Sequence, residues 1–285
     1  MTTRELEKGI HLDLGEGASY ADYLDLAKLL SAQHPRSQSH HDEMLFIIQH
    51  QTSELWMKLL LHELDEAVAL VKSERLEASF KIFARIAQIQ RMLFEQWSVL
   101  ETMTPSEYLG FRDALGKASG FQSHQYRAIE FLLGNKQPAA IEAHRGKPEH
   151  HAMLEQRLHA PSLYDEFLRW LARHGHDVPK DRVERDWSQP YESSEGVLVV
   201  FRRIYEDTER YWNEYDMCEK LVDIEERFQL WRFRHMTTVK RIIGFRRGTG
   251  GSSGVAFLKK ALDVTFFPEL WDVRTDIEMK PNPAP

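Results

Sequence analysis

Two of the fourteen histidines stand on apolar faces of expected helices, where an imidazole could act away from water. His235 has Trp231 four residues before it and Val239 four residues after it, so its ring should point into the core from a rigid helix. His50 follows Phe46 by four residues, which stacks an aromatic ring and an imidazole on one helix face. A lone histidine in such a position is more often a packed core residue, but the pair suggests a shared site.

The residue types around His235 favour a buried metal cofactor. A neutral imidazole is a good axial ligand for haem iron, and it needs an apolar shell and a partner that orients its other ring nitrogen. The sequence supplies the shell but does not identify the partner. Zinc is less well supported, because there is no HExxH motif and the single cysteine, Cys218, allows no CxxC pair. A metal site between His40 and Glu43 is a further alternative, although carboxylates there also suit the positive end of a helix.

The glycine-rich loop GTGGSSG, residues 248–254, could offer backbone N–H groups and three hydroxyls to an anion. It lacks the lysine and hydroxyl residue of a Walker A motif, and it follows a helical pattern instead of a strand, which argues against a dinucleotide site. A flexible linker is the alternative interpretation. Phe245, Val255 and Phe257 flank the loop closely and could anchor both ends.

A carboxylate ligand would favour a fixed guanidinium, and Arg112 stands on a short helix that we expect to open at Pro105. Tyr108 lies one turn earlier on the same face, so a phenol and a guanidinium could converge on one anion. Considered alone, Arg112 fits a surface ion pair better. Cys218 is interpreted as a bystander, because the sequence announces no partner for a reactive thiol.

Helices must position these side chains, because apolar residues recur at helical spacing through most of the chain. Examples are Leu45, Ile48, Leu55 and Leu59. We therefore predict an all-α protein. The stretch from Thr104 to Glu107 combines an N-cap, a proline at the first helical position and a glutamate at the third, which predicts a helix that stops near Gly116.

The second half of the chain divides into an interrupted and a regular part. Five of the eleven prolines lie between residues 138 and 190, which predicts shorter helices, one with a start signal at Ser162. Residues 136–195 could form a small inserted helical subdomain, whereas a long helical run is expected from about Phe201 to Phe245. Residues 275–285 should form a disordered tail.

Composition excludes several classes of protein. The formal charge of −7 and the pI near 6.1 argue against non-specific attraction to nucleic acid or anionic membranes. The N-terminus is unlike a signal peptide, and no apolar run approaches the roughly 18 residues of a membrane span. One cysteine provides no disulfide framework, so we expect a soluble protein of the reducing cytoplasm.

Four segments of the chain carry a family resemblance: HHDEMLFIIQHQTSELWMKLLLHEL from His40, EQWSVLETMTPSEYLGFRDALG from Glu95, SGFQSHQYRAIEFLLGNK from Ser119 and FQLWRFRHMTTVKRIIGFRRGTGGSSGVAFLKKAL from Phe228. With them, the chain between about Gly9 and Arg274 resembles the bacterial type of the tryptophan 2,3-dioxygenase family, haem enzymes that open the indole ring of L-tryptophan.

The resemblance implies roles for individual residues. His235 would be the proximal haem ligand, and His50 the distal histidine that hydrogen-bonds the indole N–H. Trp97 and Ser119 would line the haem pocket. The implied substrate-binding residues are Phe46 and Leu115 at the indole, Tyr108, Arg112 and Thr249 at the polar end of the amino acid, and Tyr20 and Tyr23, whose segment would reach into a neighbouring subunit. Ala118 departs from the family, where some members have serine before the residue matching Ser119.

The same resemblance implies one haem b per subunit, L-tryptophan and O2 as substrates, and N-formyl-L-kynurenine as the product. The reaction would be the first step of tryptophan catabolism by the kynurenine route. We expect a single domain over residues 1–285 and a homotetramer. Two other classes stay open: a non-catalytic haem sensor or carrier, and a helical module without haem in which Arg246 and Arg247 bind phosphate.

Overall fold

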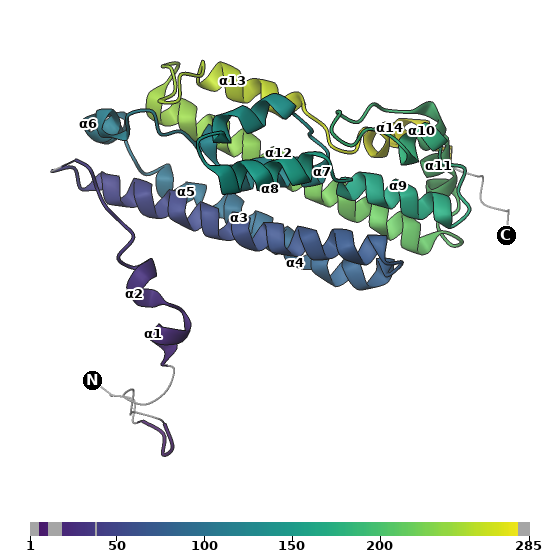
Figure 1. Cartoon of the computed structure of the whole chain (residues 1–285), viewed down its shortest axis with the longest axis horizontal. Coiled ribbons are helices and arrows are strands. Elements are labelled where there is room, and N and C mark those ends of the chain that lie inside the picture. Colours follow the sequence, from purple (N-terminus) through teal and green to yellow (C-terminus); the bar gives the residue numbers. More distant parts are fainter. Residues whose placement is uncertain (1–5, 11–18, 38, 279–285) are drawn as a thin grey trace, which may run out of the picture.

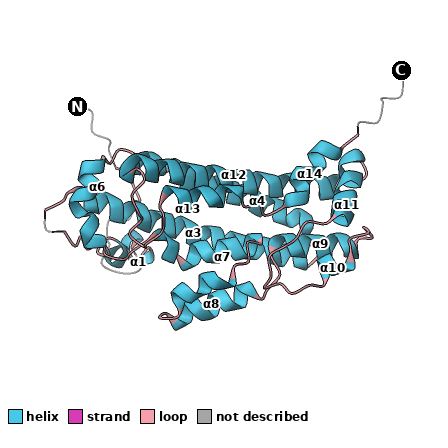
Figure 2. Cartoon of the chain, turned by 90° about the horizontal axis from the view of Figure 1, so that it is seen from above, coloured by secondary structure: helices cyan, strands magenta, loops and turns pink. Residues whose placement is uncertain are grey.

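Helices make up all the regular structure in the computed structural model, which describes residues 6–10, 19–37 and 39–278 (Figure 2). The all-α prediction is confirmed for these residues. Three long helices form the centre of the fold: α3 (Asp42–Lys72), α4 (Leu76–Glu95) and α12 (Trp212–Ile243). They run along the long axis of the molecule, with α4 packed against both of the others (Figure 1).

Shorter elements surround this centre. Helices α7 and α9 pack on α3, and α11 packs on α12 and α14. The shorter α-helices are α1 (Tyr20–Tyr23), α2 (Leu26–Leu29), α5 (Trp97–Leu100), α6 (Pro105–Phe111), α7 (His124–Leu133), α8 (Pro148–Leu158), α9 (Leu163–Arg173), α10 (Lys180–Val183), α11 (Glu195–Glu206), α13 (Val255–Lys260) and α14 (Pro268–Asp276). The 3₁₀ turns are η1 (Arg112–Leu115), η2 (Gly120–Gln122), η3 (Pro138–His144) and η4 (Ala261–Asp263).

The core lies between the long helices. Leu60 and Leu64 of α3, Ile86 of α4 and Leu221 of α12 are almost inaccessible to water. Full burial of one such side chain stabilises the fold by about 1.5–3 kcal/mol. Side chains on the inner faces of α3 and α12 are therefore held on a rigid frame.

Helix α6 begins as its sequence predicts. The Thr104 hydroxyl accepts a hydrogen bond from the Glu107 N–H, and the Glu107 carboxylate accepts one from the Thr104 N–H at 2.6 Å. The α-helical part ends at Phe111 and continues as η1 to Leu115. Gly116, at φ +58°, ends the turn, so the expected stop is confirmed.

The region of residues 136–195 consists of short helices, as its prolines predict. Helix α9 starts at the Ser162 cap, whose hydroxyl and N–H both bind Asp165. Phe167 and Leu171 of α9 are fully buried and belong to the same hydrophobic core as α3 and α12. Helix α8 lies on the outside of the molecule (Figure 2).

The long helical run expected from Phe201 to Phe245 is divided in the structure. Helix α11 ends at Glu206, α12 begins at Trp212, and residues 207–211 form a turn between them. At the C-terminus, α14 includes Thr275 and Asp276, the first residues of the expected tail. Residues 279–285 of that tail lie outside the described part of the chain.

Helices α1 and α2 stand apart from the bundle (Figure 1). The segment after α2 is bound to α3 through Gln51. The Gln51 amide donates to the Ala32 carbonyl and accepts from the Gln33 amide at 2.7 Å. No helix in the described ranges is long and apolar enough to cross a membrane.

Candidate active site

An aromatic cluster of Phe46, His50, Tyr108 and Phe111 forms where α3 meets α6. Phe46 and His50 lie one turn apart on α3, with ring centroids 4.1 Å apart. The Phe46 ring is 5.9 Å from the Tyr108 ring and 5.6 Å from the Phe111 ring, both carried by α6. The predicted residues Phe46, His50 and Tyr108 are thus brought together. Sequence reasoning missed Phe111, which its position three residues after Tyr108 could have indicated.

His50 has a defined tautomer. Its Nδ1 lies 2.7 Å from the carbonyl oxygen of Phe46, and a carbonyl only accepts, so Nδ1 carries the proton. Burial lowers the pKa of His50, which keeps the ring neutral near pH 7. The other nitrogen, Nε2, is therefore a hydrogen-bond acceptor.

His235 of α12 is fixed by aromatic rings. It stacks on Trp97 of α5, with centroids 4.9 Å and planes 12° apart, and Trp231 lies 5.5 Å from it. Among the described residues no hydrogen bond engages either ring nitrogen of His235. The orienting partner that the sequence did not identify is therefore not found there, and the two indoles hold the ring.

His50 influences the pKa of His235. Apolar surroundings lower the pKa of His235 to about 4, and the nearby His50 lowers it in the same direction. An electrostatic effect of one side chain on the other requires that they lie close together. His50 on α3 and His235 on α12 therefore lie near enough to act on each other electrostatically, and both rings are neutral near pH 7.

Arg112 is the first residue of η1 and lies beside Tyr108 of the aromatic cluster. Burial raises the pKa of Tyr108, while the Arg112 guanidinium beside it acts in the opposite direction. The Arg112 Nη2 donates to the Arg247 carbonyl at 2.6 Å, but its buried Nε has no hydrogen-bond partner among the described residues. An N–H in this state is costly, and a ligand carboxylate would satisfy it.

The glycine-rich loop is packed onto the segment that follows η1. The Thr249 hydroxyl donates to the Ala118 carbonyl. Gly250 faces Ser119 so closely that a Cβ at position 250 would lie 2.6 Å from the Ser119 Cβ. The loop is therefore packed against residues 118 and 119, unlike the flexible linker that the sequence also allowed.

Part of the loop backbone is already engaged. The Gly248 N–H donates to the Ser252 carbonyl at 3.1 Å, and the Gly251 N–H donates to the Gly248 carbonyl at 3.0 Å. The Gly254 N–H likewise donates to the Ser252 hydroxyl, so three of the seven N–H groups of the loop are engaged within it. That several of the others face an anion stays a prediction.

The remaining predicted residues are Leu115, Tyr20 and Tyr23. Leu115 is half-buried against the hydrophobic core. Tyr20 and Tyr23 lie on α1, are 77% and 83% exposed, and are not brought to the site of their own chain. The segment of residues 11–18 before them lies outside the described part.

The sequence reasoning underestimated burial among the remaining histidines. His144 and His176 are buried, and His144 belongs to a group with His124 and His150, whose rings stack at 3.7 Å. Their neighbours in the chain are polar, so only the packing of α7, η3 and α8 reveals this group.

The side chains present fit a cofactor in which the metal takes most of its ligands from the cofactor itself. Across the described ranges no three His, Cys, Asp or Glu side chains are arranged to hold a metal ion, which disfavours both zinc and a site at His40 to Glu43. Haem needs only one or two protein ligands. His235 without a hydrogen bond, and the buried Trp97 Nε1 without a partner, fit such a group.

The fold is that of a helical bundle, and the residues of the candidate site come from its helices α3, α5, α6 and α12. The family model described as tryptophan 2,3-dioxygenase matches residues 4–198 and 139–277. A tryptophan 2,3-dioxygenase of Myxococcus xanthus is 66% identical over 99% of this chain and 97% of its own length. Those of Serratia proteamaculans and Xanthomonas euvesicatoria are 62% and 58% identical, over 97% and 98% of the chain and 99% and 94% of their own lengths. The chain belongs to the tryptophan 2,3-dioxygenase family.

Proposed function

We propose that this protein is a haem-dependent dioxygenase that inserts both atoms of O2 across the indole C2–C3 bond of L-tryptophan. The product would be N-formyl-L-kynurenine, in the first step of tryptophan catabolism by the kynurenine route. The observation that carries the proposal is that two neutral imidazoles, His50 and His235, lie near enough to influence each other, while Arg112 beside Tyr108 keeps an unsatisfied N–H.

One haem b per subunit would be held by His235, with Trp97 and Ser119 in its surroundings. The haem would supply the binding and activation of O2. The chain supplies aromatic neighbours for the ligand: Trp97 and Trp231 pack on the His235 ring, which is half-buried. Because the pKa of His235 is low, the ring is neutral and its lone pair is available at pH 7.

The polar end of the substrate would be held by Arg112. Its buried Nε would donate to the carboxylate, which gives a charge-assisted hydrogen bond in a place of low polarity. The Tyr108 phenol lies beside the guanidinium and can donate to the same carboxylate. Thr249 would close the site from the loop, near the amino group of the substrate.

The indole would lie against Phe46 and Leu115, with its N–H directed at His50. Nε2 of His50 can accept that hydrogen bond because Nδ1 already donates to the Phe46 carbonyl. An indole N–H is a very weak acid, so we assign His50 to orientation and not to proton abstraction. Orientation of a bound substrate can lower a barrier by up to about 7–11 kcal/mol in ideal cases.

One assay tests the function. Purified protein reconstituted with haem and reduced should consume O2 when L-tryptophan is added and should form a product with the absorbance of N-formylkynurenine. A haem spectrum without product would support the sensor or carrier class. Protein that takes up no haem but binds phosphate near Arg246 and Arg247 would support the anion-binding class.

We also propose that the whole chain forms one domain and that four chains assemble in the cytoplasm. Exposed apolar residues support an assembly: Ile48, Leu55 and Leu59 lie on one face of α3 and are 47%, 50% and 37% exposed. Tyr20 and Tyr23 would reach the site of a neighbouring subunit. Light scattering should give the mass of four chains, and the mass of a single chain would contradict the assembly.

A further inference from the structure

A buried arginine on α12 lies one turn before His235. The side chain of Arg232 is only 3% exposed. Its Nη2 donates to the Glu130 carboxylate at 2.9 Å, and its Nε donates to the Tyr126 hydroxyl at 3.3 Å. The rings of Phe228 and Phe266 lie 4.7 and 5.0 Å from the guanidinium carbon. Removal of such a buried, fully surrounded charge leaves several partners unsatisfied.

Arg232 also grips the segment of residues 261–267, together with Glu225. Its Nη1 donates to the carbonyls of Ala261 and Val264, at 3.0 and 3.3 Å. Glu225 stands seven residues earlier on the same face of α12 and accepts from the backbone N–H groups of residues 266 and 267, at 2.7 and 3.0 Å. We call Glu225 and Arg232 the clasp.

The clasp fixes the far end of the glycine-rich loop. The loop leaves α12 after Ile243 and returns through α13 and η4 to residues 261–267. One end is therefore continuous with α12, and the other is bound to the same helix by two buried charges. A loop anchored at both ends to one helix has less conformational freedom in which to leave its seat on Ser119.

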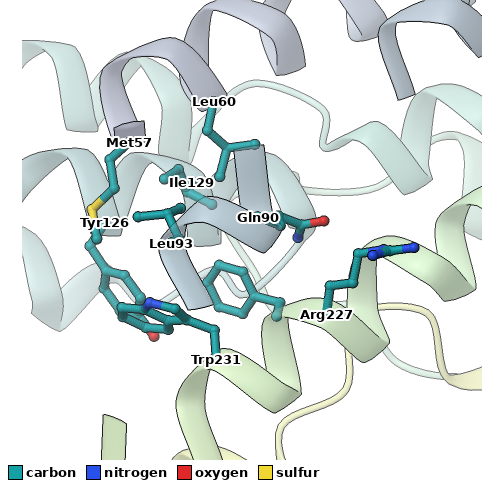
Figure 3. A pocket seen from close by; sticks show the side chains of 9 residues that line it. Met57, Leu60, Gln90, Leu93, Tyr126, Ile129, Arg227 and Trp231 are labelled. Carbon is teal, nitrogen blue, oxygen red and sulfur yellow. The ribbon is translucent and has the colours of Figure 1, made fainter. Parts of the chain in front are cut away.

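Aromatic contacts connect the clasp to the His235 ring. The Tyr126 ring lies 5.5 Å from Trp231, and Trp231 lies 5.5 Å from His235. Figure 3 shows Tyr126 and Trp231 next to each other at a small cavity between α3, α4, α7 and α12. The cavity has a volume of about 10 Å³, which is room for about one water molecule, so Trp231 can make only small shifts.

We propose that Arg232 is a positioning residue that links two parts of the site: the His235 ring, through Tyr126 and Trp231, and the loop that carries Thr249, through residues 261–264. The inference rests on the proposed function, because it assigns those two parts to the two sides of one reaction. It goes further in naming a residue that touches neither substrate nor cofactor.

The test compares Arg232→Lys with a matched control, Arg185→Lys, in the haem-loaded enzyme. The side chain of Arg185 is 10% exposed, binds the buried Asp165, donates to two backbone carbonyls and lies over the rings of Trp187 and Tyr191. Lysine keeps the charge in both places but cannot reach all the partners of arginine.

Arg232→Lys should raise KM for L-tryptophan by roughly tenfold, as expected for the loss of a charge-assisted hydrogen bond, with a smaller fall in kcat. It should also speed amide hydrogen exchange in residues 248–254 and shift the absorption bands of the reduced enzyme. Arg185→Lys should lower Tm without these three changes. Equal behaviour of the two variants would reduce Arg232 to a structural residue and overturn the proposal.

If Arg232→Lys does not fold, Tyr126→Phe replaces it, since this change removes only the hydroxyl that Arg232 binds. It should raise KM by roughly threefold and shift the same absorption bands. An unchanged KM together with unchanged bands would overturn the link to His235. Wild-type enzyme that forms no product would instead refute the proposed function, while the exchange of residues 248–254 would still test the clasp.

Discussion

The tautomer of His50 decides what this residue can do. With the proton on Nδ1 and the pKa lowered by burial, the ring offers an acceptor and no acidic proton to a substrate near pH 7. Its geometry is set by a carbonyl one turn earlier on the same helix. The hydrogen bond that sets the tautomer of His50 therefore lies within α3.

His50→Ala should keep measurable turnover, because a hydrogen-bond acceptor that only orients the indole is not required for bond formation. We expect kcat/KM to fall by about tenfold to a hundredfold, as for the loss of one orienting contact. Steady-state kinetics with saturated haem check this. Complete loss of turnover with intact haem and substrate binding would instead make His50 an obligatory base.

Local patterns predicted much at this scale. The spacing of Trp231, His235 and Val239 placed an imidazole on an inward helix face, and the structure confirms its apolar surroundings. The stacking partner Trp97 comes from another helix and was indicated only by the family resemblance. His144 was missed because its burial arises from the contact of three elements.

At the scale of elements, the site depends on how α6, η1 and the glycine-rich loop meet. The capping box at Thr104 sets the start of α6, which fixes the direction of Tyr108 and Arg112. The sequence predicted this start because capping is local. It did not predict the break at residues 207–211, since no glycine or proline marks it.

Gly250→Ala should loosen the loop, because the added methyl would collide with Ser119. We expect KM for L-tryptophan to rise by roughly tenfold and the melting temperature to fall by only a few degrees. Gly146→Ala is the matched control, since a Cβ at position 146 meets no atom within 4 Å. A variant at position 250 that behaves like the one at 146 would show that the close seat on Ser119 is unimportant.

At the scale of the whole molecule, buried histidines couple stability to pH. Burial, followed by the charges of neighbouring histidines, lowers the pKa of both His124 and His144. Between these lowered values and the ordinary value near 6.5, the unfolded chain binds more protons than the folded one. Stability should therefore fall as the pH falls below about 6.5.

Urea unfolding at pH 7.5 and pH 5.5 checks this dependence. His144→Leu should reduce the difference in unfolding free energy between the two pH values, because it removes a buried group that must be neutral in the fold. His159→Gln is the control, because the His159 side chain is 59% exposed. A stability that is constant or rises toward pH 5.5 would contradict the sign of the effect.

The way in which the long helices pack together is harder to predict from the sequence than the helices themselves. Helical periodicity predicted the long helices, but the same pattern also includes Ile48, Leu55 and Leu59, which face outward in the single chain. Periodicity shows that a face is apolar and not what covers it. How His50 on α3 and His235 on α12 are placed relative to each other follows from long-range packing, because α4 packs against both helices.

The most direct measurement is the absorption spectrum of the reduced protein, taken for the wild type and for His235→Ala, each with and without L-tryptophan. We predict a haem spectrum in the wild type that changes when L-tryptophan binds. In the variant we predict loss of stable haem binding, or an altered spectrum that free imidazole restores. An unaltered haem spectrum in His235→Ala would contradict the assignment of His235 as the iron ligand and, with it, the central claim.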